Sequence, residues 1–253
     1  MPVQVYFVGA GPGDPELLTI KAKKIIERAD VIIYADSLVN PEVCAYARSG
    51  AVIHKSASLT LEEITDIMVV AVRNGKVVAR LHTGDPSIYG AIAEQMAELD
   101  KRSVAYEVIP GVSSLFAAAS SLKAELTIPD LSQTVIITRM EGRTPVPASE
   151  NLRSLAAHQS SMAIFLSASL AEEVVTELLA GGYPPETPAA VVYRASWTDE
   201  IVLHGTLNDI AARLKASGIK KQAIILVGNF LAAKEGLLRS KLYDGNFKHE
   251  YRP

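Results

Sequence analysis

The chain has 253 residues, a net charge of −3 from 25 basic and 28 acidic side chains, and one cysteine, Cys44. This balance argues against binding a nucleic-acid backbone as the main task. One cysteine excludes an internal disulfide and a cysteine-based zinc cluster, and it suits a reducing compartment. No apolar run approaches the ~20 residues that span a bilayer, and no secretory leader pattern opens the chain. We therefore expect a cytosolic protein with no membrane, nucleic-acid or metal site.

A glycine-rich turn follows the first predicted strand, Val3–Val8. Residues 9–17 read Gly-Ala-Gly-Pro-Gly-Asp-Pro-Glu-Leu. The glycines permit positive φ and close approach of the backbone to a ligand, while Asp14 followed by Pro15 is typical of a helix start. A dinucleotide-binding turn needs a third glycine where Asp14 stands, and a carboxylate there would oppose a pyrophosphate. The pattern therefore disfavours NAD.

A second glycine turn followed by Asp-Pro comes after the strand that contains Val77–Ala79. This strand ends at Thr83-Gly84, and we predict that Asp85 caps a helix with Pro86 in its first turn, running over Ser87–Asp100. In a parallel sheet such a junction lies at the carboxyl edge of the strands, where ligands bind. The free amides of the predicted helix would favour an anionic group there.

The first half of the chain alternates between predicted strands and helices. Further strands are expected at Val31–Tyr34, Ala51–His54 and Ala105–Ile109, and helices at Thr19–Arg28 and from the capping box Thr60–Glu63 to Asn74. A third glycine turn, Pro110–Ser114, follows the last of these strands. Five strands joined in this way predict a parallel sheet with right-handed crossovers.

Polar residues and Pro129 interrupt the pattern between residues 123 and 132, so we predict domains at 1–122 and 123–253. The second half predicts strands at Thr134–Thr138, Met162–Leu166, Ala189–Tyr193, Ile201–His204 and Ala223–Val227. It also predicts a capping box at Ser169–Glu172 and a helix over Thr206–Ser217. Too few residues separate the third and fourth of these strands for a crossover helix, so they should be antiparallel and the second sheet mixed.

Three motifs, taken in chain order, resemble a known family. They are Val8–Pro15, Thr83–Pro86 and Ile109–Ser114, and together they are similar to the tetrapyrrole (corrin/porphyrin) methyltransferases. Within that family, Ser132–Arg139 and the long loop through Gly142–Pro147 are similar to the subgroup that methylates carbon 11 of precorrin-4 or cobalt-precorrin-4 in cobalamin biosynthesis. Long loops in compact domains are often functional.

The resemblance implies a tetrapyrrole methylase fold. It consists of two α/β domains with the ligand cleft between them, commonly in a homodimer. It also implies S-adenosylmethionine (SAM) as methyl donor and S-adenosylhomocysteine (SAH) as product. The implied cofactor-binding residues are Pro12, Thr83, Gly84, Asp85, Ile88, Ser113, Ser114, Leu166 and Ala195. Leu166 stands where relatives often have methionine, and Ala195 where they often have glycine.

The resemblance also suggests proton handling by Asp36 and Lys55, the nearest matches to an acid and a lysine of related enzymes. A substrate with several carboxylates calls for cations, and we predict a substrate-binding role for Arg80, Arg139, Arg143 and Arg194. Two alternatives stay open. The same fold could methylate another ring position or another substrate, or the protein could bind the methyl donor or a tetrapyrrole without turnover.

Overall fold

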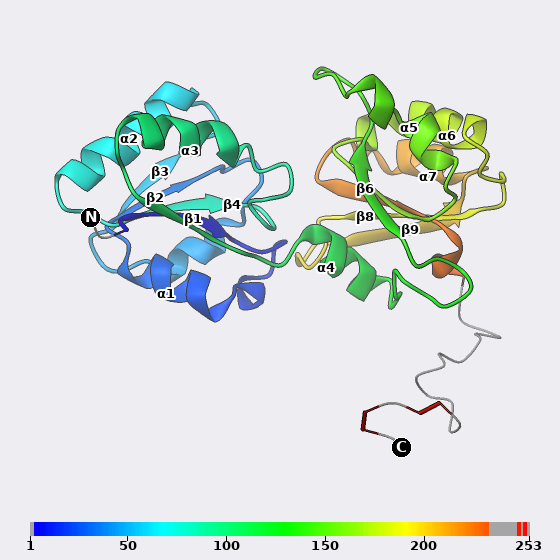
Figure 1. The fold of residues 1–253 in the computed structure, drawn as a ribbon, viewed down its shortest axis with the longest axis horizontal. Helices are drawn as coiled ribbons and strands as arrows, with labels where there is room; N and C mark the ends of the chain where they lie inside the picture. Colours follow the sequence, from blue (N-terminus) through cyan, green and yellow to red (C-terminus); the bar gives the residue numbers. More distant parts are fainter. Residues whose placement is uncertain (1–2, 233–246, 249, 252–253) are drawn as a thin grey trace. The chain divides into compact units, whose positions relative to one another are not determined.

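The computed structural model of the chain describes residues 3–232, 247–248 and 250–251. The chain divides into two compact units, which are described separately below (Figure 1). Unit 1 comprises Met1–Ala117 and Arg194–Asp199, and unit 2 comprises Ala118–Tyr193 and Glu200–Pro253. The predicted division at residues 122 and 123 remains a proposal. Sequence reasoning did not anticipate that Arg194–Asp199 would pack with the first unit.

Unit 1 is built on a five-stranded sheet in the order β3-β2-β4-β1-β5. Every neighbouring pair is parallel, which confirms the prediction for the first half of the chain. The strands are β1 (Val5–Gly9), β2 (Val31–Tyr34), β3 (Val52–Lys55), β4 (Val78–His82) and β5 (Tyr106–Ile109). Because β1 is the fourth strand in the order, its glycine turn is flanked by the ends of β4 and β5.

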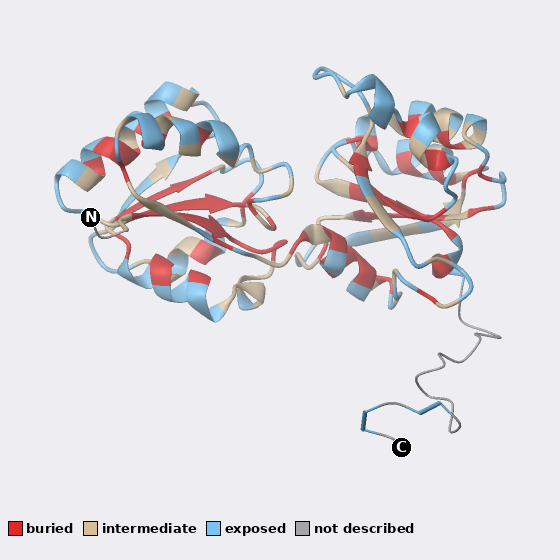
Figure 2. Ribbon diagram, in the orientation of Figure 1, coloured by how far each residue is buried: buried red, intermediate tan, exposed pale blue. Residues whose placement is uncertain are grey.

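Both faces of this sheet are covered by helices, so its central strands are buried (Figures 1 and 2). Helix α1 (Ile20–Arg28) packs on one face, and α2 (Leu61–Arg73) with α3 (Ile92–Lys101) packs on the other. The predicted capping box at the start of α2 is confirmed, with Thr60 and Glu63 bonding each other's backbone amides. Burial on both faces explains why these strands are nearly continuous apolar runs.

The helix predicted over Ser87–Asp100 is present as α3, but its predicted start is wrong. Residues 86–89 form a turn, and α3 begins only at Ile92. Tyr89 and Ala91 have φ of 54° and 49°, left-handed values that interrupt a right-handed helix. Asp85 still accepts a hydrogen bond from the Ser87 amide at 2.9 Å, but as part of a tight turn. The predicted anion site at a helix N-terminus therefore does not form at this position.

Unit 2 contains a second five-stranded sheet in the order β6-β7-β10-β8-β9. The β6–β7 pair is parallel and the other pairs are antiparallel, which confirms the predicted mixed sheet. Its strands are β6 (Val135–Arg139), β7 (Ser161–Phe165), β8 (Pro188–Tyr193), β9 (Ile201–Thr206) and β10 (Ala223–Val227).

Three helices cover one face of this sheet, and their aliphatic side chains form its core. They are α5 (Leu152–Ala156), α6 (Ala171–Ala180) and α7 (Ile210–Ser217); α4 (Ser114–Ser121) precedes the sheet. The predicted capping box at Ser169–Glu172 is wrong, because a 3₁₀ helix over Ala168–Leu170 leads directly into α6 without a side-chain cap. None of the helices in the described residues is long and apolar enough to cross a bilayer.

Candidate functional site

Two of the predicted glycine turns bond to each other in unit 1. The Gly84 amide donates to the Gly11 carbonyl at 2.8 Å, and the Gly11 amide donates to the Gly84 carbonyl at 3.3 Å. Both glycines have positive φ, 75° at Gly11 and 64° at Gly84, which only glycine adopts without cost. The turns after β1 and β4 therefore form one continuous backbone surface at the carboxyl edge of the sheet.

The third turn is packed against the same surface. A Cβ added to Gly111 would lie 2.2 Å from the Gly84 oxygen, and one added to Gly9 would lie 2.5 Å from the Gly111 Cα. Such distances are far below van der Waals contact, so no side chain fits at either position. The glycines predicted from spacing alone are thus required because three strand ends meet backbone to backbone.

Asp85 ties these turns together through its carboxylate. One oxygen accepts from the Ser87 amide at 2.9 Å, and the other accepts from the Gly111 amide at 2.9 Å. The pKa of Asp85 is lowered: partial burial opposes the shift, and the hydrogen bonds from Ser87 and Gly111 outweigh it. A carboxylate oxygen can accept more than one hydrogen bond, so the predicted contact between Asp85 and a cofactor remains compatible with this role.

The remaining predicted cofactor residues of unit 1 lie in the same turns or in the segment that packs with them. Ile88 is half-buried in the turn after Asp85. Ser113 is buried at the start of α4, where its Oγ accepts from the Leu115 amide at 3.3 Å, and Ser114 follows it. Ala195 is 4% exposed within Arg194–Asp199. These residues reach unit 1 from three separate parts of the chain.

A buried polar group lies below the Thr83 turn, on the α3 side of β4. Arg80 is 6% exposed, and its guanidinium donates to Gln95 Oε1 at 3.2 Å and to Ser56 Oγ at 2.9 Å. Burial lowers the pKa of Arg80 to about 10. Its guanidinium is therefore committed to oxygen atoms inside unit 1, which leaves the predicted substrate contact as an untested proposal.

His82 shares this face of β4 with Arg80. It is 6% exposed, and its Nε2 is buried without a hydrogen-bond partner. Burial and the neighbouring Arg80 charge lower the pKa of His82 to about 3, against a hydrogen bond with the Gly90 backbone that raises it. His82 is consequently neutral at physiological pH, a state that avoids placing a second charge beside Arg80.

Asp36 and Lys55 stand at the carboxyl ends of β2 and β3, the edge of the sheet that also carries the glycine turns. Lys55 is the register partner of Tyr34, two residues before Asp36. Asp36 accepts a hydrogen bond from the Ala57 amide at 3.2 Å, and both side chains are exposed. The two predicted proton-handling residues therefore lie on adjacent strand ends, with β2 next to β4.

The predicted residues of unit 2 gather at the parallel ends of β6 and β7. Leu166 follows β7, is 66% exposed and has φ of 54°, a costly conformation for a residue with a Cβ. Arg139 ends β6 and donates to the carbonyls of Thr144 and Pro145 at 3.2 and 2.7 Å. Arg143 is exposed in the loop that Arg139 holds. An exposed apolar side chain on strained backbone is typical of a contact surface.

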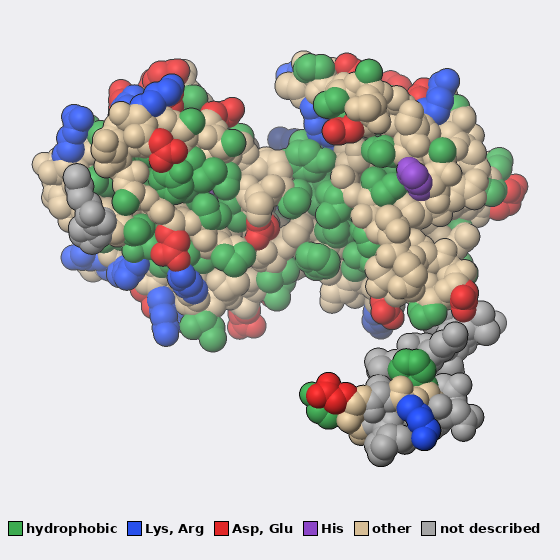
Figure 3. Space-filling model, in the orientation of Figure 1, with side chains coloured by type: hydrophobic (Ala, Val, Ile, Leu, Met, Phe, Trp, Pro, Cys, Tyr) green, Lys and Arg blue, Asp and Glu red, His purple; other side chains and the backbone are tan. Residues whose placement is uncertain are grey.

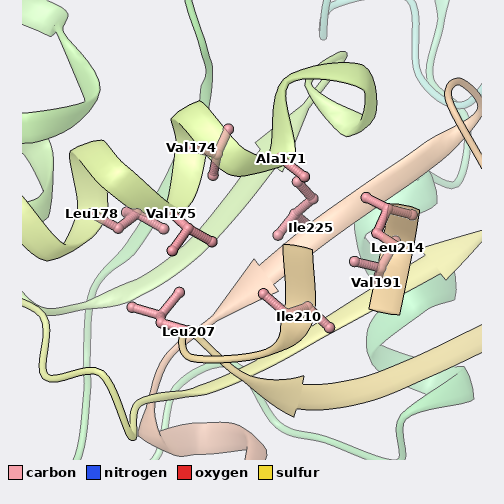
Figure 4. A pocket seen from close by; sticks show the side chains of 9 residues that line it. All are labelled: Ala171, Val174, Val175, Leu178, Val191, Leu207, Ile210, Leu214 and Ile225. Atoms are coloured by element: carbon pink, nitrogen blue, oxygen red, sulfur yellow. The ribbon is translucent and has the colours of Figure 1, made fainter. Parts of the chain in front are cut away.

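An apolar pocket in unit 2 is not a second candidate site. It is lined by nine aliphatic residues, Ala171, Val174, Val175, Leu178, Val191, Leu207, Ile210, Leu214 and Ile225 (Figure 4). A binding site needs some polar groups to orient a ligand, and this lining belongs to the core under α6 and α7. On the visible faces of both units, acidic and basic side chains are interspersed (Figure 3). No cluster of three or more potential metal ligands occurs among the described residues.

Three residues that sequence reasoning did not assign to the site hold the turn after β1. Asn40 Nδ2 donates to the Gly13 carbonyl at 2.9 Å, Ser196 Oγ accepts from the Asp14 amide at 3.0 Å, and Trp197 Nε1 donates to the Pro12 carbonyl at 2.9 Å. All three contacts join residues far apart in the chain. The only local sequence signal for any of these three residues was that Trp197, the single tryptophan of the chain, lies two residues after the predicted site residue Ala195.

Comparison with known proteins gives consistent results. Residues 4–211 match the family model described as tetrapyrrole (corrin/porphyrin) methylases. A cobalt-precorrin-4 C(11)-methyltransferase from Methanocaldococcus jannaschii is 63% identical over 98% of this chain and 96% of its own length. A crystal structure of a cobalt precorrin-4 methyltransferase of cobalamin biosynthesis is 49% identical with a TM-score of 0.88, covering 90% of this chain and 95% of that one. A uroporphyrin-III C-methyltransferase from Thermus thermophilus, in complex with SAH, is 30% identical with a TM-score of 0.75, covering 90% and 99%.

Proposed function

Because the chain belongs to the tetrapyrrole (corrin/porphyrin) methylases, we propose that it is a SAM-dependent methyltransferase. The proposed reaction transfers a methyl group to carbon 11 of precorrin-4 or cobalt-precorrin-4 in cobalamin biosynthesis. The observation that carries the proposal is the near-full-length similarity to a cobalt-precorrin-4 C(11)-methyltransferase. A cytosolic location and a homodimer are proposed on the family resemblance, and sedimentation velocity tests the second.

The residues of unit 1 fit a methyl donor that lies against backbone. The glycine turns leave peptide groups without side chains at the strand ends, and Pro12, Gly84 and Ser113 are all part of this surface. We propose that the donor contacts these turns, with Asp85, Ile88, Ser114 and Ala195 beside them and Leu166 contributing from unit 2. Backbone amides suit the carboxylate of the methionine moiety, and Asp85 suits a hydroxyl or ammonium group.

Bound SAM supplies an electrophilic methyl group on a sulfonium, which the ring carbon attacks in line as the thioether leaves. The protein's contribution is to orient the two reactants and to exclude water, and orientation of this kind is worth ~7–11 kcal/mol of barrier. A strong nucleophilic side chain is unnecessary because the ring carbon is the nucleophile. The close backbone packing of the three glycine turns suits a site that must hold the methyl donor in a fixed orientation.

The substrate's carboxylates require cations on the protein side. Arg143 is exposed, and Arg139 lies at the same loop, so we propose that the β6 end of unit 2 binds substrate carboxylates. Arg194 is held by an ion pair with Asp199, and we propose that it also contacts a substrate carboxylate. Arg80 is buried and bonded to Gln95 and Ser56, so it could contact the substrate only if a substrate carboxylate reached its buried guanidinium.

Asp36 is proposed as the group that accepts a proton when the methylated ring redistributes charge, with Lys55 beside it. Asp36→Asn keeps an oxygen for the Ala57 amide and so preserves the local fold. With saturating substrates, a base role predicts a loss of kcat of about 100-fold. A variant that retains wild-type kcat would exclude the base role.

The reaction is tested by incubating the protein with ¹³C-methyl SAM and either precorrin-4 or cobalt-precorrin-4, and then locating the labelled methyl group by NMR. The proposal predicts one new methyl group on carbon 11 and stoichiometric SAH. Label at another ring carbon would identify the same fold with a different regiochemistry. Tight binding of both ligands without transfer would instead indicate a non-catalytic binding protein.

A further inference from the structure

The segment Arg194–Asp199, here called the strap, contacts the loop Gly11–Asp14, here called the glycine loop, inside unit 1. The strap connects β8 to β9 in the chain, so it is separated from the glycine loop by more than 180 residues. Two of its side chains bond directly to the loop's backbone. Trp197 Nε1 donates to the Pro12 carbonyl at 2.9 Å, and Ser196 Oγ accepts from the Asp14 amide at 3.0 Å.

The ring of Trp197 also occupies the space that a side chain at position 13 would need. A Cβ added to Gly13 would lie 2.0 Å from Trp197 Cδ1 and 2.3 Å from its Nε1. Any other residue at position 13 would displace the indole and break its bond to the loop. Glycine is therefore needed at this position to admit the strap, which is a different reason from the positive φ that Gly11 requires.

The indole is itself held by Arg194. The Arg194 guanidinium carbon lies 3.7 Å from the centroid of the Trp197 ring, a close cation–π contact, and Arg194 forms an ion pair with Asp199. Arg194 and Ser196 have φ of 48° and 71°. Left-handed backbone at two residues with side chains is costly, and it persists where surrounding contacts enforce it and commonly where function uses it.

These contacts converge on the loop that is proposed to bind the methyl donor. Pro12, whose carbonyl Trp197 holds, is a proposed cofactor-binding residue, and Ala195 lies in the strap itself. Among the described residues, the bonds between the loop and its neighbours in the chain are confined to Asp14, which accepts from the Glu16 and Leu17 amides. Gly11 pairs with Gly84, and Gly13 accepts from Asn40. Pro12 has no amide hydrogen, so the middle of the loop depends on partners from elsewhere in the chain.

We propose that Ser196 and Trp197 are positioning residues, which hold the glycine loop in the conformation that binds the methyl donor. The proposal rests on the proposed function, because it concerns the affinity for SAM and SAH. It predicts that the strap side chains affect donor affinity by fixing Pro12 and Asp14 in place, and that the rate with both substrates saturating is left largely unchanged.

The chain offers a native reporter, since Trp197 is its only tryptophan. Its emission depends on the polarity around the indole, which is half-buried between Arg194 and Gly13 in this structure. Titration of the full-length protein with SAH should therefore change the intrinsic fluorescence, and the change should saturate at the same Kd that calorimetry measures.

The decisive variants are Trp197→Phe, which keeps a ring above Gly13 without the N–H donor, and Ser196→Ala, which removes the acceptor for the Asp14 amide. Each should raise the Kd for SAH, measured by calorimetry, about three- to tenfold, as expected for one lost hydrogen bond. Each should raise the KM for SAM by a similar factor and leave kcat within about twofold. In the ligand-free protein, Ser196→Ala should also speed hydrogen exchange at the Asp14 amide.

Matched controls come from unit 2. Tyr183→Phe removes a hydrogen bond from an aromatic side chain to the Ser160 carbonyl, and Ser217→Ala removes one from a serine to the Leu214 carbonyl. Both should lower the melting temperature without changing the Kd for SAH. Wild-type Kd values in both strap variants would overturn the positioning role. Absence of SAH binding to the wild-type protein would instead contradict the proposed function on which the role depends.

Discussion

The candidate residues of unit 1 and unit 2 are held in different ways. In unit 1 three strand ends meet backbone to backbone, and one carboxylate, Asp85, bonds two of the turns. In unit 2 the candidates Arg139, Arg143 and Leu166 stand at strand ends or in a loop, with Arg143 and Leu166 exposed. The first arrangement tolerates almost no side chain, whereas the second presents side chains outward.

This difference fits the two tasks of a methyl-transfer site, which are to bind the methyl donor and to bind the substrate. A donor that is the same for every member of the family can be bound by a backbone surface that leaves little room for variation. A substrate that differs between members needs side chains that vary in length and charge, and exposed loops accept such changes at small cost to stability. We propose on this basis that the glycine turns of unit 1 bind the methyl donor and that the β6 end of unit 2 binds the tetrapyrrole.

The largest effect expected at neutral pH is on stability, at Gly111. In Gly111→Ala the new Cβ would lie 2.2 Å from the Gly84 oxygen, so the three turns must separate. We expect a loss of at least about 1–3 kcal/mol in unfolding free energy and loss of SAH binding. In the control Gly142→Ala, the nearest atom is the Leu170 side chain at 3.4 Å. Denaturant unfolding of both variants tests the contrast, and equal stability would show that the turns are not tightly packed.

The second effect is a dependence of stability on pH that originates in unit 1. Because the pKa of His82 is lowered from 6.5 to about 3 in the folded protein, the unfolded state binds its proton first as pH falls. His82 should therefore destabilise the fold between pH 6.5 and about 3, with a slope approaching about 1.4 kcal/mol per pH unit.

Replacing His82 by Gln should remove the contribution of His82 to the pH dependence of the free energy of unfolding. Chemical denaturation of the wild-type protein and of His82→Gln at several pH values measures the two pH dependences. A slope in His82→Gln equal to that of the wild type would mean that His82 is not buried as a neutral group.

An intermediate effect is expected at Asp85. Asp85→Ala removes both backbone hydrogen bonds, and Asp85→Asn can keep one. Calorimetry should find SAH affinity decreasing from wild type to Asn to Ala, with a change of about tenfold or more for Ala. The exposed acid Glu186 of unit 2 is the control, and Glu186→Ala should bind SAH like the wild type. Unchanged affinity in Asp85→Ala would remove Asp85 from the donor site.

The smallest effect separates the two arginines of unit 2. Arg143→Gln should raise the KM for the tetrapyrrole about three- to fivefold, with no change in SAM affinity or melting temperature, because its side chain is exposed. Arg139→Gln should also lower the melting temperature, since it loses bonds to the Thr144 and Pro145 carbonyls. If Arg143→Gln has wild-type kinetics, its charge is solvated and does not bind substrate.

Local sequence patterns predicted most of the fold. The ten strands were each placed to within two residues at each end, since apolar runs bounded by turns specify buried strands well. The helix expected from Ser87 begins only at Ile92, because Tyr89 and Ala91 have left-handed backbone conformations that composition does not reveal. The capping box at Ser169–Glu172 failed because a 3₁₀ turn took up its position.

The site was predicted less completely for a physical reason. Glycine spacing identified the turns that meet, but their partners come from distant parts of the chain. Asp85 bonds an amide 26 residues away, and Trp197 bonds a carbonyl 185 residues away. Such contacts depend on how strands are ordered in the sheet, so no local pattern could assign Ser196 or Asn40, and the rarity of tryptophan was the only signal for Trp197.

The most direct test of the account is hydrogen–deuterium exchange of the full-length protein with and without SAH. If the glycine turns of unit 1 bind the methyl donor, SAH should slow exchange at the amides of residues 11, 13–14, 83–85, 87–88 and 111–115 most strongly, with a smaller effect near Leu166. Protection confined to other segments, such as α6 and α7 around the aliphatic pocket of unit 2, would contradict the account.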